Sequence, residues 1–142
     1  MDPAFWDSSS LVPLCVRQSA TPKAQTLDMK HPKVVWWSAP VEMQSAFARL
    51  ARMGRIAPNE LVQARVRLDH LRRDWNEVEP SDELRERAEQ LVDRFPLKAA
   101  DALQLSAAWI WCQGRPRSRP FISGDVQLLH AAQQLGFSGI EA

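Results

Sequence analysis

The chain has 142 residues, of which 45% are hydrophobic and 25% are charged, a composition ordinary for one globular domain. Its formal net charge of +1 excludes a strongly basic coat protein that holds nucleic acid by bulk electrostatics, but not a nucleic-acid enzyme with a local basic patch. Two cysteines are too few for a disulfide framework or a cysteine zinc cluster. We find no secretory signal and no apolar run long enough for a membrane span, and therefore expect a cytoplasmic protein.

The predicted strands are short apolar or β-branched runs, and the predicted helices have apolar residues at three- and four-residue spacing. In chain order, the residues predict a strand at 4–6, helices at 8–18 and 22–31, a strand at 34–37, helices at 40–54 and 61–75, a short strand at 75–79, helices at 84–95 and 99–112, a strand at 120–123, a helix at 126–135 and a last strand at 137–141. Thr21 and Ser81 are candidate helix N-caps, and Gly136 is expected to end the last helix.

Strands that are separated by helices favour parallel pairing, because parallel neighbours need long crossover connections. We therefore predict a single domain over residues 1–142, a three-layer α/β/α fold around a central, mostly parallel sheet. The helix at 99–112 is apolar nearly all round, which indicates a buried central helix. The tract at roughly 54–95 is mostly helical and is expected to project as a clip or cover.

Four acidic residues fall where such a sheet binds its ligands, beyond the carboxyl ends of the strands. Asp7 follows the first strand and Asp125 follows the fourth, while Glu42 and Asp101 lie near the starts of helices. Four ionised carboxylates cannot share a small volume without a counter-cation, and oxygen ligands select Mg²⁺ or Mn²⁺. A cation held in this way supports phosphodiester hydrolysis.

Helix capping is the alternative explanation for these acids, because Asp and Glu are favoured at helix N-termini. It applies with equal force to Asp7, Glu42 and Asp125. Asp101 differs, because it lies in an almost wholly apolar helix where a buried charge needs a partner. The four acids together therefore favour a metal site more than any one of them does.

Four segments resemble, in order and over nearly the whole chain, the four motifs of PIN-domain ribonucleases. They are FWDSSSLV at 5–12, SAPVE at 38–42, LKAADALQLSAA at 97–108 and FISGDVQLLHAA at 121–132. The third and fourth motifs are the more specific ones. The chain departs from the family pattern at Ser123, where Thr is frequent, and in its Trp-rich second strand.

The resemblance implies a Mg²⁺- or Mn²⁺-dependent endoribonuclease similar to the VapC toxins of type II toxin–antitoxin pairs. It implies that Asp7, Glu42, Asp101 and Asp125 are the catalytic metal ligands. It also implies RNA as substrate, products with a 5′-phosphate and a 3′-hydroxyl, a homodimer and a small antitoxin partner. For Ser9 and Ser123 we hold two interpretations open, support of the neighbouring acid and a simple helix-start hydroxyl.

Two other functions stay open at this point. The first is a catalytically inactive PIN-like module that binds RNA or protein. The second is an α/β phosphatase with an aspartate nucleophile, although that chemistry wants a second acid close behind the first strand, where Ser9 stands. Metal-dependent cleavage of RNA separates the leading function from the first alternative.

Other residue types give weaker signals. The three histidines have no metal-ligand spacing, and both cysteines are expected to be small buried residues. We expect four tryptophans in apolar runs to be core residues: Trp36, Trp37, Trp109 and Trp111. Two basic tracts are candidates for a rim that attracts RNA to the acids, namely the helices at 49–73 and the loop with Arg115, Arg117 and Arg119.

Overall fold

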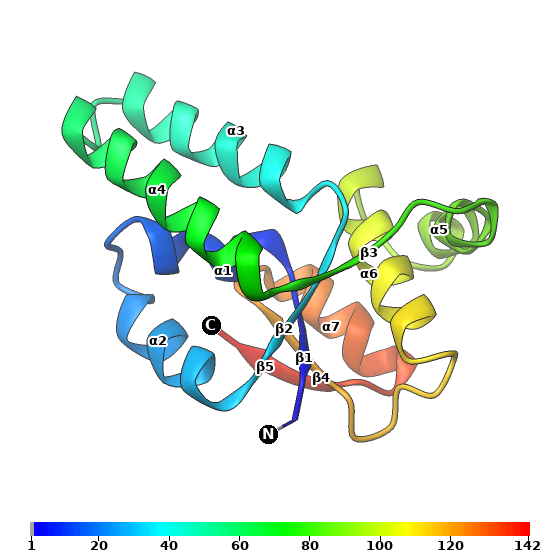
Figure 1. Cartoon of the computed structure of the whole chain (residues 1–142). Helices are drawn as coiled ribbons and strands as arrows, with labels where there is room; N and C mark the ends of the chain where they lie inside the picture. Colours follow the sequence, from blue (N-terminus) through cyan, green and yellow to red (C-terminus); the bar gives the residue numbers. More distant parts are fainter. Residues whose placement is uncertain (1) are drawn as a thin grey trace.

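The computed structural model describes residues 2–142, and its strands form one sheet in which every neighbouring pair is parallel. The strands are β1 (Ala4–Trp6), β2 (Lys33–Trp36), β3 (Asn76–Val78), β4 (Pro120–Ser123) and β5 (Ser138–Glu141). Their order in the sheet is β3-β2-β1-β4-β5, so β1 lies at the centre (Figure 1). All carboxyl ends therefore lie at one edge of the sheet, as the alternation of strands and helices predicts.

Helices cover both faces of the sheet, which confirms the predicted three-layer fold. They are α1 (Ser8–Cys15), α2 (Thr21–Lys30), α3 (Ala39–Arg52), α4 (Pro58–Asp74), α5 (Asp82–Arg94), α6 (Ala99–Trp111) and α7 (Val126–Leu135). Buried residues of α1 to α4 pack on one face, and those of α5 to α7 pack on the other. Figure 1 shows α3 and α4 side by side as a hairpin that extends beyond the sheet.

The range 54–95, for which the sequence predicts a helical clip, divides between the layers. Its middle is β3, which pairs with β2 at the edge of the sheet. Before it, α4 packs with α1 and α3 on one face, while α5 after it packs with α6 on the other face. The projecting part is the α3–α4 hairpin, and α5 belongs to the layer that contains α6.

Alternation along β1 divides the core between the two faces of the sheet, because successive side chains of a strand point to opposite sides. Ala4 and Trp6 belong to the core shared with α1 to α4, whereas Phe5 belongs to the core shared with α5 to α7. The Phe5 ring stacks on Phe121 of β4 with ring centroids 5.4 Å apart. Strand β1 thus has apolar residues on both sides, as a central parallel strand requires.

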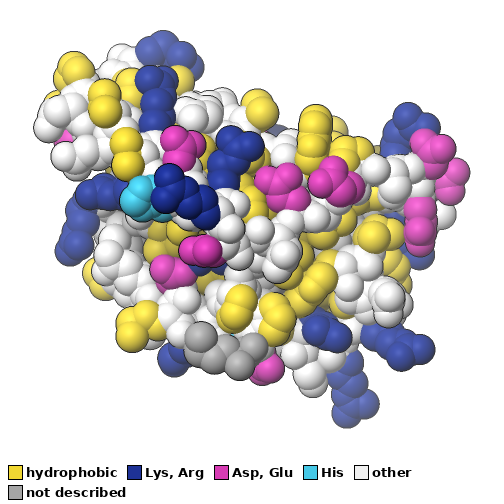
Figure 2. Space-filling model, in the orientation of Figure 1, with side chains coloured by type: hydrophobic (Ala, Val, Ile, Leu, Met, Phe, Trp, Pro, Cys, Tyr) yellow, Lys and Arg dark blue, Asp and Glu magenta, His cyan; other side chains and the backbone are white. Residues whose placement is uncertain are grey.

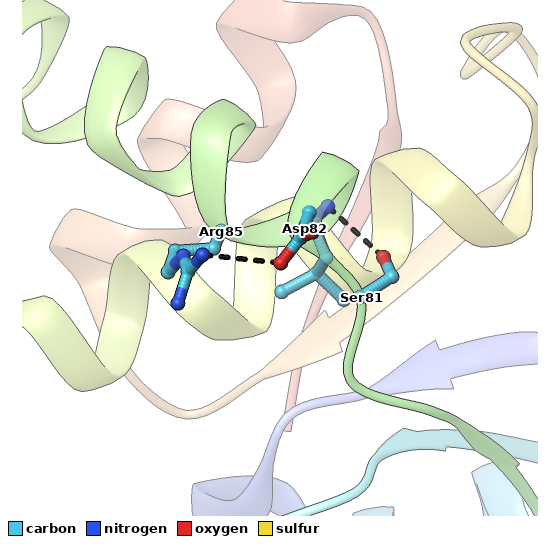
Figure 3. Close-up of polar contacts among 4 residues, drawn as sticks. Ser81, Asp82 and Arg85 are labelled. Atoms are coloured by element: carbon cyan, nitrogen blue, oxygen red, sulfur yellow. Dashed lines mark hydrogen bonds and ion pairs between the residues drawn. The ribbon is translucent and has the colours of Figure 1, made fainter.

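Local signals fix several helix ends. The Ser81 hydroxyl accepts a hydrogen bond from the backbone N–H of Leu84 (3.1 Å), and Arg85 pairs with Asp82 (3.0 Å) in the same turn (Figure 3). Gly136 ends α7 with φ 112°, a left-handed conformation that favours glycine. The prediction for Thr21 is wrong, because Thr21 is the first residue of α2 and its hydroxyl donates to Pro13 O (2.7 Å), which ties α2 to α1.

The tryptophans divide differently from the expectation. Trp36 is buried, but Trp37 is 52% exposed, so the assignment of Trp37 to the core is wrong. Trp109 and Trp111 are only half-buried. Both cysteines are buried and free, as expected. None of the helices in residues 2–142 is long and apolar enough to span a membrane.

Candidate active site

The four predicted acids lie at the carboxyl edge of the sheet, where four helices begin. Asp7 joins β1 to α1, Glu42 lies in the first turn of α3, Asp101 in the first turn of α6, and Asp125 joins β4 to α7. The acids are close enough to influence one another's ionisation. Glu42 and Asp101 both raise the pKa of Asp7, and Asp125 and Glu42 both raise the pKa of Asp101.

Capping explains only one of the four acids. Asp125 caps α7, because its Oδ1 accepts hydrogen bonds from the backbone N–H groups of Gln127 (2.9 Å) and Leu128 (3.2 Å). Asp7 occupies the N-cap position of α1, yet its side chain makes no capping hydrogen bond. Neither α3 nor α6 has a side-chain cap at its start. Capping hydrogen bonds therefore do not account for Asp7, Glu42 and Asp101, although the helix dipole favours an acid at each of these positions.

Asp7 is the most buried of these acids, with 4% of its surface exposed. Two hydroxyls donate to its Oδ2, those of Ser9 (2.5 Å) and Ser123 (2.8 Å). Burial is the largest cause that raises the pKa of Asp7, to about 6 from 3.8, and the two hydroxyls oppose it by stabilising the charged form. A carboxyl that titrates near neutral pH in this environment is typical of a functional site.

The same two serines connect Asp7 to the loop after β4. Ser9 Oγ accepts a hydrogen bond from the backbone N–H of Gly124 (3.0 Å), and Ser123 Oγ accepts one from the backbone N–H of Asp125 (2.9 Å). Each hydroxyl thus donates its proton to Asp7 and accepts from the loop that carries Asp125. The sequence left open whether these serines only start helices; the structure gives both a direct contact with the acid.

Glu42 is held by polar side chains that the sequence analysis did not identify. Ser38 Oγ donates to Glu42 Oε2. Gln104 Nε2 donates to both carboxylate oxygens of Glu42 (3.1 and 3.3 Å) and to Ser8 Oγ (2.9 Å). The signal for Gln104 was its position, because it is a polar residue about one turn after Asp101 in a mostly apolar helix.

Gln104 also has an unused acceptor at this edge. Its side chain is fully buried, and its Oε1 has no hydrogen-bond partner within residues 2–142. A buried amide oxygen without a donor costs about 1–3 kcal/mol. Such an acceptor, among carboxylates, is compatible with water or a hydrated cation as its partner.

The oxygen atoms at this edge, from carboxylates and an amide, are of the chemical type that Mg²⁺ and Mn²⁺ prefer as ligands. Within residues 2–142, however, no three His, Cys, Asp or Glu side chains are grouped closely enough, as they stand, to hold one ion. A shared ion therefore requires the acidic side chains to turn toward it. The assignment of Asp7, Glu42, Asp101 and Asp125 as metal ligands stays a prediction.

The basic loop at 115–119 does not lie near the acids, contrary to its expected role as a rim. It precedes β4, so it lies at the amino edge of the sheet, while Asp125 follows β4 at the carboxyl edge. Figure 2 shows Lys and Arg side chains gathered at this end of the molecule, at the lower right. The arginines of the loop are exposed, and the guanidinium carbon of Arg119 lies 5.3 Å from the centroid of the Trp111 ring.

The second basic tract is also remote from the acids for the most part. Arg49 and Arg52 lie in the last turn of α3, whereas Glu42 lies in its first turn. The base beside the site is Lys98, the residue before α6, which lowers the pKa of Asp101. Sequence reasoning missed Lys98 because a single lysine carries no pattern.

No protein-family model matches the sequence, and no curated protein matches it. Solved structures do match. PAE2754 from Pyrobaculum aerophilum aligns with a TM-score of 0.69 and 15% identity, over 99% of this chain and 89% of that one. A chain from a toxin–antitoxin complex of Klebsiella pneumoniae aligns with a TM-score of 0.59 and 20% identity, over 87% of this chain and 88% of that one. At these identities the likeness establishes a shared fold.

Proposed function

We propose that this chain is a Mg²⁺- or Mn²⁺-dependent endoribonuclease, and that it acts as the toxin of a VapBC-type toxin–antitoxin system in the cytoplasm. The observation that carries the proposal is the convergence of four acids at one edge, of which Asp7, Glu42 and Asp101 cap no helix. The motifs similar to those of PIN-domain ribonucleases and the fold shared with a chain of a toxin–antitoxin complex support it.

The acids and their neighbours divide into two roles under this proposal. Asp7, Glu42, Asp101 and Asp125 would hold the cation, which when bound polarises a phosphoryl oxygen and makes water a better nucleophile. Ser9 and Ser123 fix the orientation of Asp7 through their hydrogen bonds to Oδ2. Partners of this kind set the position and basicity of the ligands that they contact.

Glu42 is oriented from two sides. Ser38 donates from the turn before α3, and Gln104 donates from α6 across the sheet edge. Lys98 offsets part of the negative charge beside Asp101 and would draw a phosphate toward the acids. The chain's own residues thus supply ligands, orientation and one positive charge.

Cleavage of a labelled RNA by the purified protein tests the activity, with Mn²⁺, with Mg²⁺ and with EDTA. We expect cleavage only with a divalent cation. Asp7→Asn and Asp101→Asn should each lower the rate by more than about 100-fold, beyond the range typical of groups that only orient ligands. The matched control is Asp93→Asn, an exposed acid of α5, which should cleave normally. Cleavage at the wild-type rate by Asp7→Asn would contradict the proposal.

A small antitoxin is the proposed protein partner. Exposed apolar side chains on the α3–α4 hairpin and on α5 give such a partner a surface: Met53, Val62, Val66 and Val92. Expression of the chain alone should stop growth, and expression with the adjacent reading frame should restore it. Light scattering of the purified protein tests the proposed homodimer. RNA binding without cleavage, under all metal conditions, would favour the inactive binding module instead.

A further inference from the structure

We propose that Trp37 and the cavity beside Trp36 form a binding site for one unpaired nucleobase of the RNA, next to the acidic edge. The inference rests on the proposed function for the identity of the ligand. It begins from an asymmetry between adjacent tryptophans, because Trp36 is 6% exposed and Trp37 is 52% exposed. A large aromatic ring in water loses the free energy that its burial would give, so an exposed one on a rigid element suggests a ligand.

The position of Trp37 relates it to the acids. Strand β2 pairs with β1 in a register that sets Val34 beside Phe5, which continues to Trp36 beside Asp7; Trp37 is the next residue along the chain, just past the end of β2. Adjacent strands lie about 4.8 Å apart. Glu42 is in the first turn of α3, the helix that begins two residues after Trp37. A base bound on Trp37 would therefore leave its phosphate close to the acids.

Trp37 is held in place by a backbone hydrogen bond and by a ring contact. Its backbone N–H donates to Val78 O (3.1 Å), which continues the pairing of β2 with β3 beyond the last strand residue. The ring of Trp36 meets the ring of Trp37 edge-on, with centroids 6.5 Å apart and planes at 62°. Because the ring is already held in place, a base that stacks on it would cost little further conformational entropy of the side chain.

A cavity of about 350 Å³, within the usual size of small-ligand pockets, lies on Trp36, the ring that Trp37 meets edge-on; Trp37 does not line it. Trp36 and Leu103 give it apolar surface, and Ser81, Asp82 and Arg85 give it a polar rim. Figure 3 shows the rim residues together at the start of α5. A nucleobase is a flat apolar body with hydrogen-bonding edges, so one stacked on Trp37 would have the apolar wall and polar rim of this cavity beside it.

The rim also offers charge for the backbone of the RNA. The side chain of Arg85 is 72% exposed, and within residues 2–142 its one ion pair is with the still more exposed Asp82. An ion pair in such contact with water contributes little to stability, so Arg85 can exchange Asp82 for a phosphate at small cost. Arginine binds phosphate through two parallel N–H groups, which gives the contact direction as well as charge.

The test measures binding of a fluorescein-labelled single-stranded hexaribonucleotide in EDTA, where no metal-dependent cleavage occurs. We expect Trp37→Ala to weaken binding about 5- to 100-fold, the loss that corresponds to one stacked base. Trp37→Phe should retain most of the affinity, because Phe also stacks. Met29→Ala is the matched control, since Met29 is exposed on α2 away from this edge, and it should bind like the wild type.

A set of hexamers with one abasic position each makes the test specific for a base. One abasic position should weaken binding to the wild type and have no further effect on Trp37→Ala. Arg85→Ala should weaken all hexamers equally and lower the slope of log affinity against log salt by about one. Equal affinity of the wild type and Trp37→Ala would overturn the inference, and so would equal abasic effects in both proteins. Failure of the proposed function looks different: RNA binds and depends on Trp37, but no cation induces cleavage.

Discussion

The amide of Gln104 reaches across the edge of the sheet to Glu42: its Nε2 lies 3.1 Å from Glu42 Oε1 and 3.3 Å from Glu42 Oε2. The bond connects α6 to α3, two helices on opposite faces of the sheet that carry two of the four acids. Because Nε2 also donates to Ser8 (2.9 Å), the first residue of α1, one amide of α6 contacts the first turns of both α1 and α3.

Gln104→Met should lower RNA cleavage about 10- to 100-fold, the usual loss when a group that orients a ligand is removed. The free energy of unfolding should change by less than about 1 kcal/mol, since the variant also removes the unpaired Oε1. Gln104→Glu separates orientation from volume. Its added carboxylate repels Glu42, so this variant should unfold more easily at pH 8 than at pH 5. Urea denaturation and initial rates provide both readouts.

Asp7→Asn should make the protein more stable at high pH. Burial raises the pKa of Asp7 to about 6 from 3.8, so Asp7 stabilises the fold fully below about pH 4, and that contribution is lost as the pH rises through 6. The pKa difference between the unfolded and folded states corresponds to about 3 kcal/mol of lost stability at high pH in the wild type. The variant avoids this loss but weakens a hydrogen bond worth about 1 kcal/mol, which leaves a net gain of about 2 kcal/mol.

Urea denaturation in EDTA from pH 4.5 to pH 8 measures this effect. The variant should exceed the wild type by about 2 kcal/mol at pH 8, and the advantage should disappear toward pH 4.5. Asp93→Asn, at an exposed position, should follow the wild-type curve. A pH-independent difference between Asp7→Asn and the wild type would show that Asp7 is ionised throughout.

Ser9→Ala should shift the pH dependence of cleavage. The Ser9 hydroxyl lowers the pKa of Asp7, so its removal raises that pKa further. A metal ligand must be ionised, and the acidic limb of the rate profile should therefore move to higher pH in the variant. Ser9→Thr keeps the hydroxyl and should restore the wild-type limb. If all three profiles coincide, the ionisation of Asp7 does not limit the rate.

Mn²⁺ should raise the melting temperature of the wild type. At a concentration 100 times the Kd, binding adds about 2.7 kcal/mol, which is about 5–10 °C for a domain of this size. Asp101→Asn should lose most of this shift, and Asp93→Asn should keep it. Differential scanning fluorimetry with Mn²⁺ and EDTA provides the comparison, and an undiminished shift in Asp101→Asn would place the ion elsewhere.

The double variant Arg115→Ala/Arg117→Ala should cleave a hexaribonucleotide within about twofold of the wild-type rate. The loop lies beyond the far end of α6, whose 13 residues span about 20 Å, well over the screening length of about 8 Å. Lys98→Ala, beside Asp101, should reduce the affinity for the same RNA more strongly. A larger loss in the arginine variant would show that RNA extends over both edges.

The sequence predicts the sheet well because its strands are short apolar runs and every connection contains a helix. It also predicts the edge where the acids lie, since Asp7 and Asp125 directly follow strands. The same rule, applied to the loop before β4, places Arg115 at the opposite edge. The expectation that this loop forms a rim beside the acids was wrong because it considered the charge of the loop and not its position in the topology.

Gln104 and Trp37 mark where sequence patterns carry too little information. A glutamine in an apolar helix does not reveal whether its amide is solvated or buried against Glu42, because that depends on how α6 crosses α3. A run of four apolar residues at 34–37 predicts a buried strand but not the residue at which the chain leaves the sheet. Trp37 lies just past that point, so its exposure is a property of the sheet edge.

The four helices that begin at the acids direct the positive ends of their dipoles toward them. These partial charges offset part of the repulsion among the carboxylates from the moment the helices pack. The charge balance of this edge therefore does not depend on a bound cation alone. Under the proposed function, a cation would then bind to and leave an edge that is already folded.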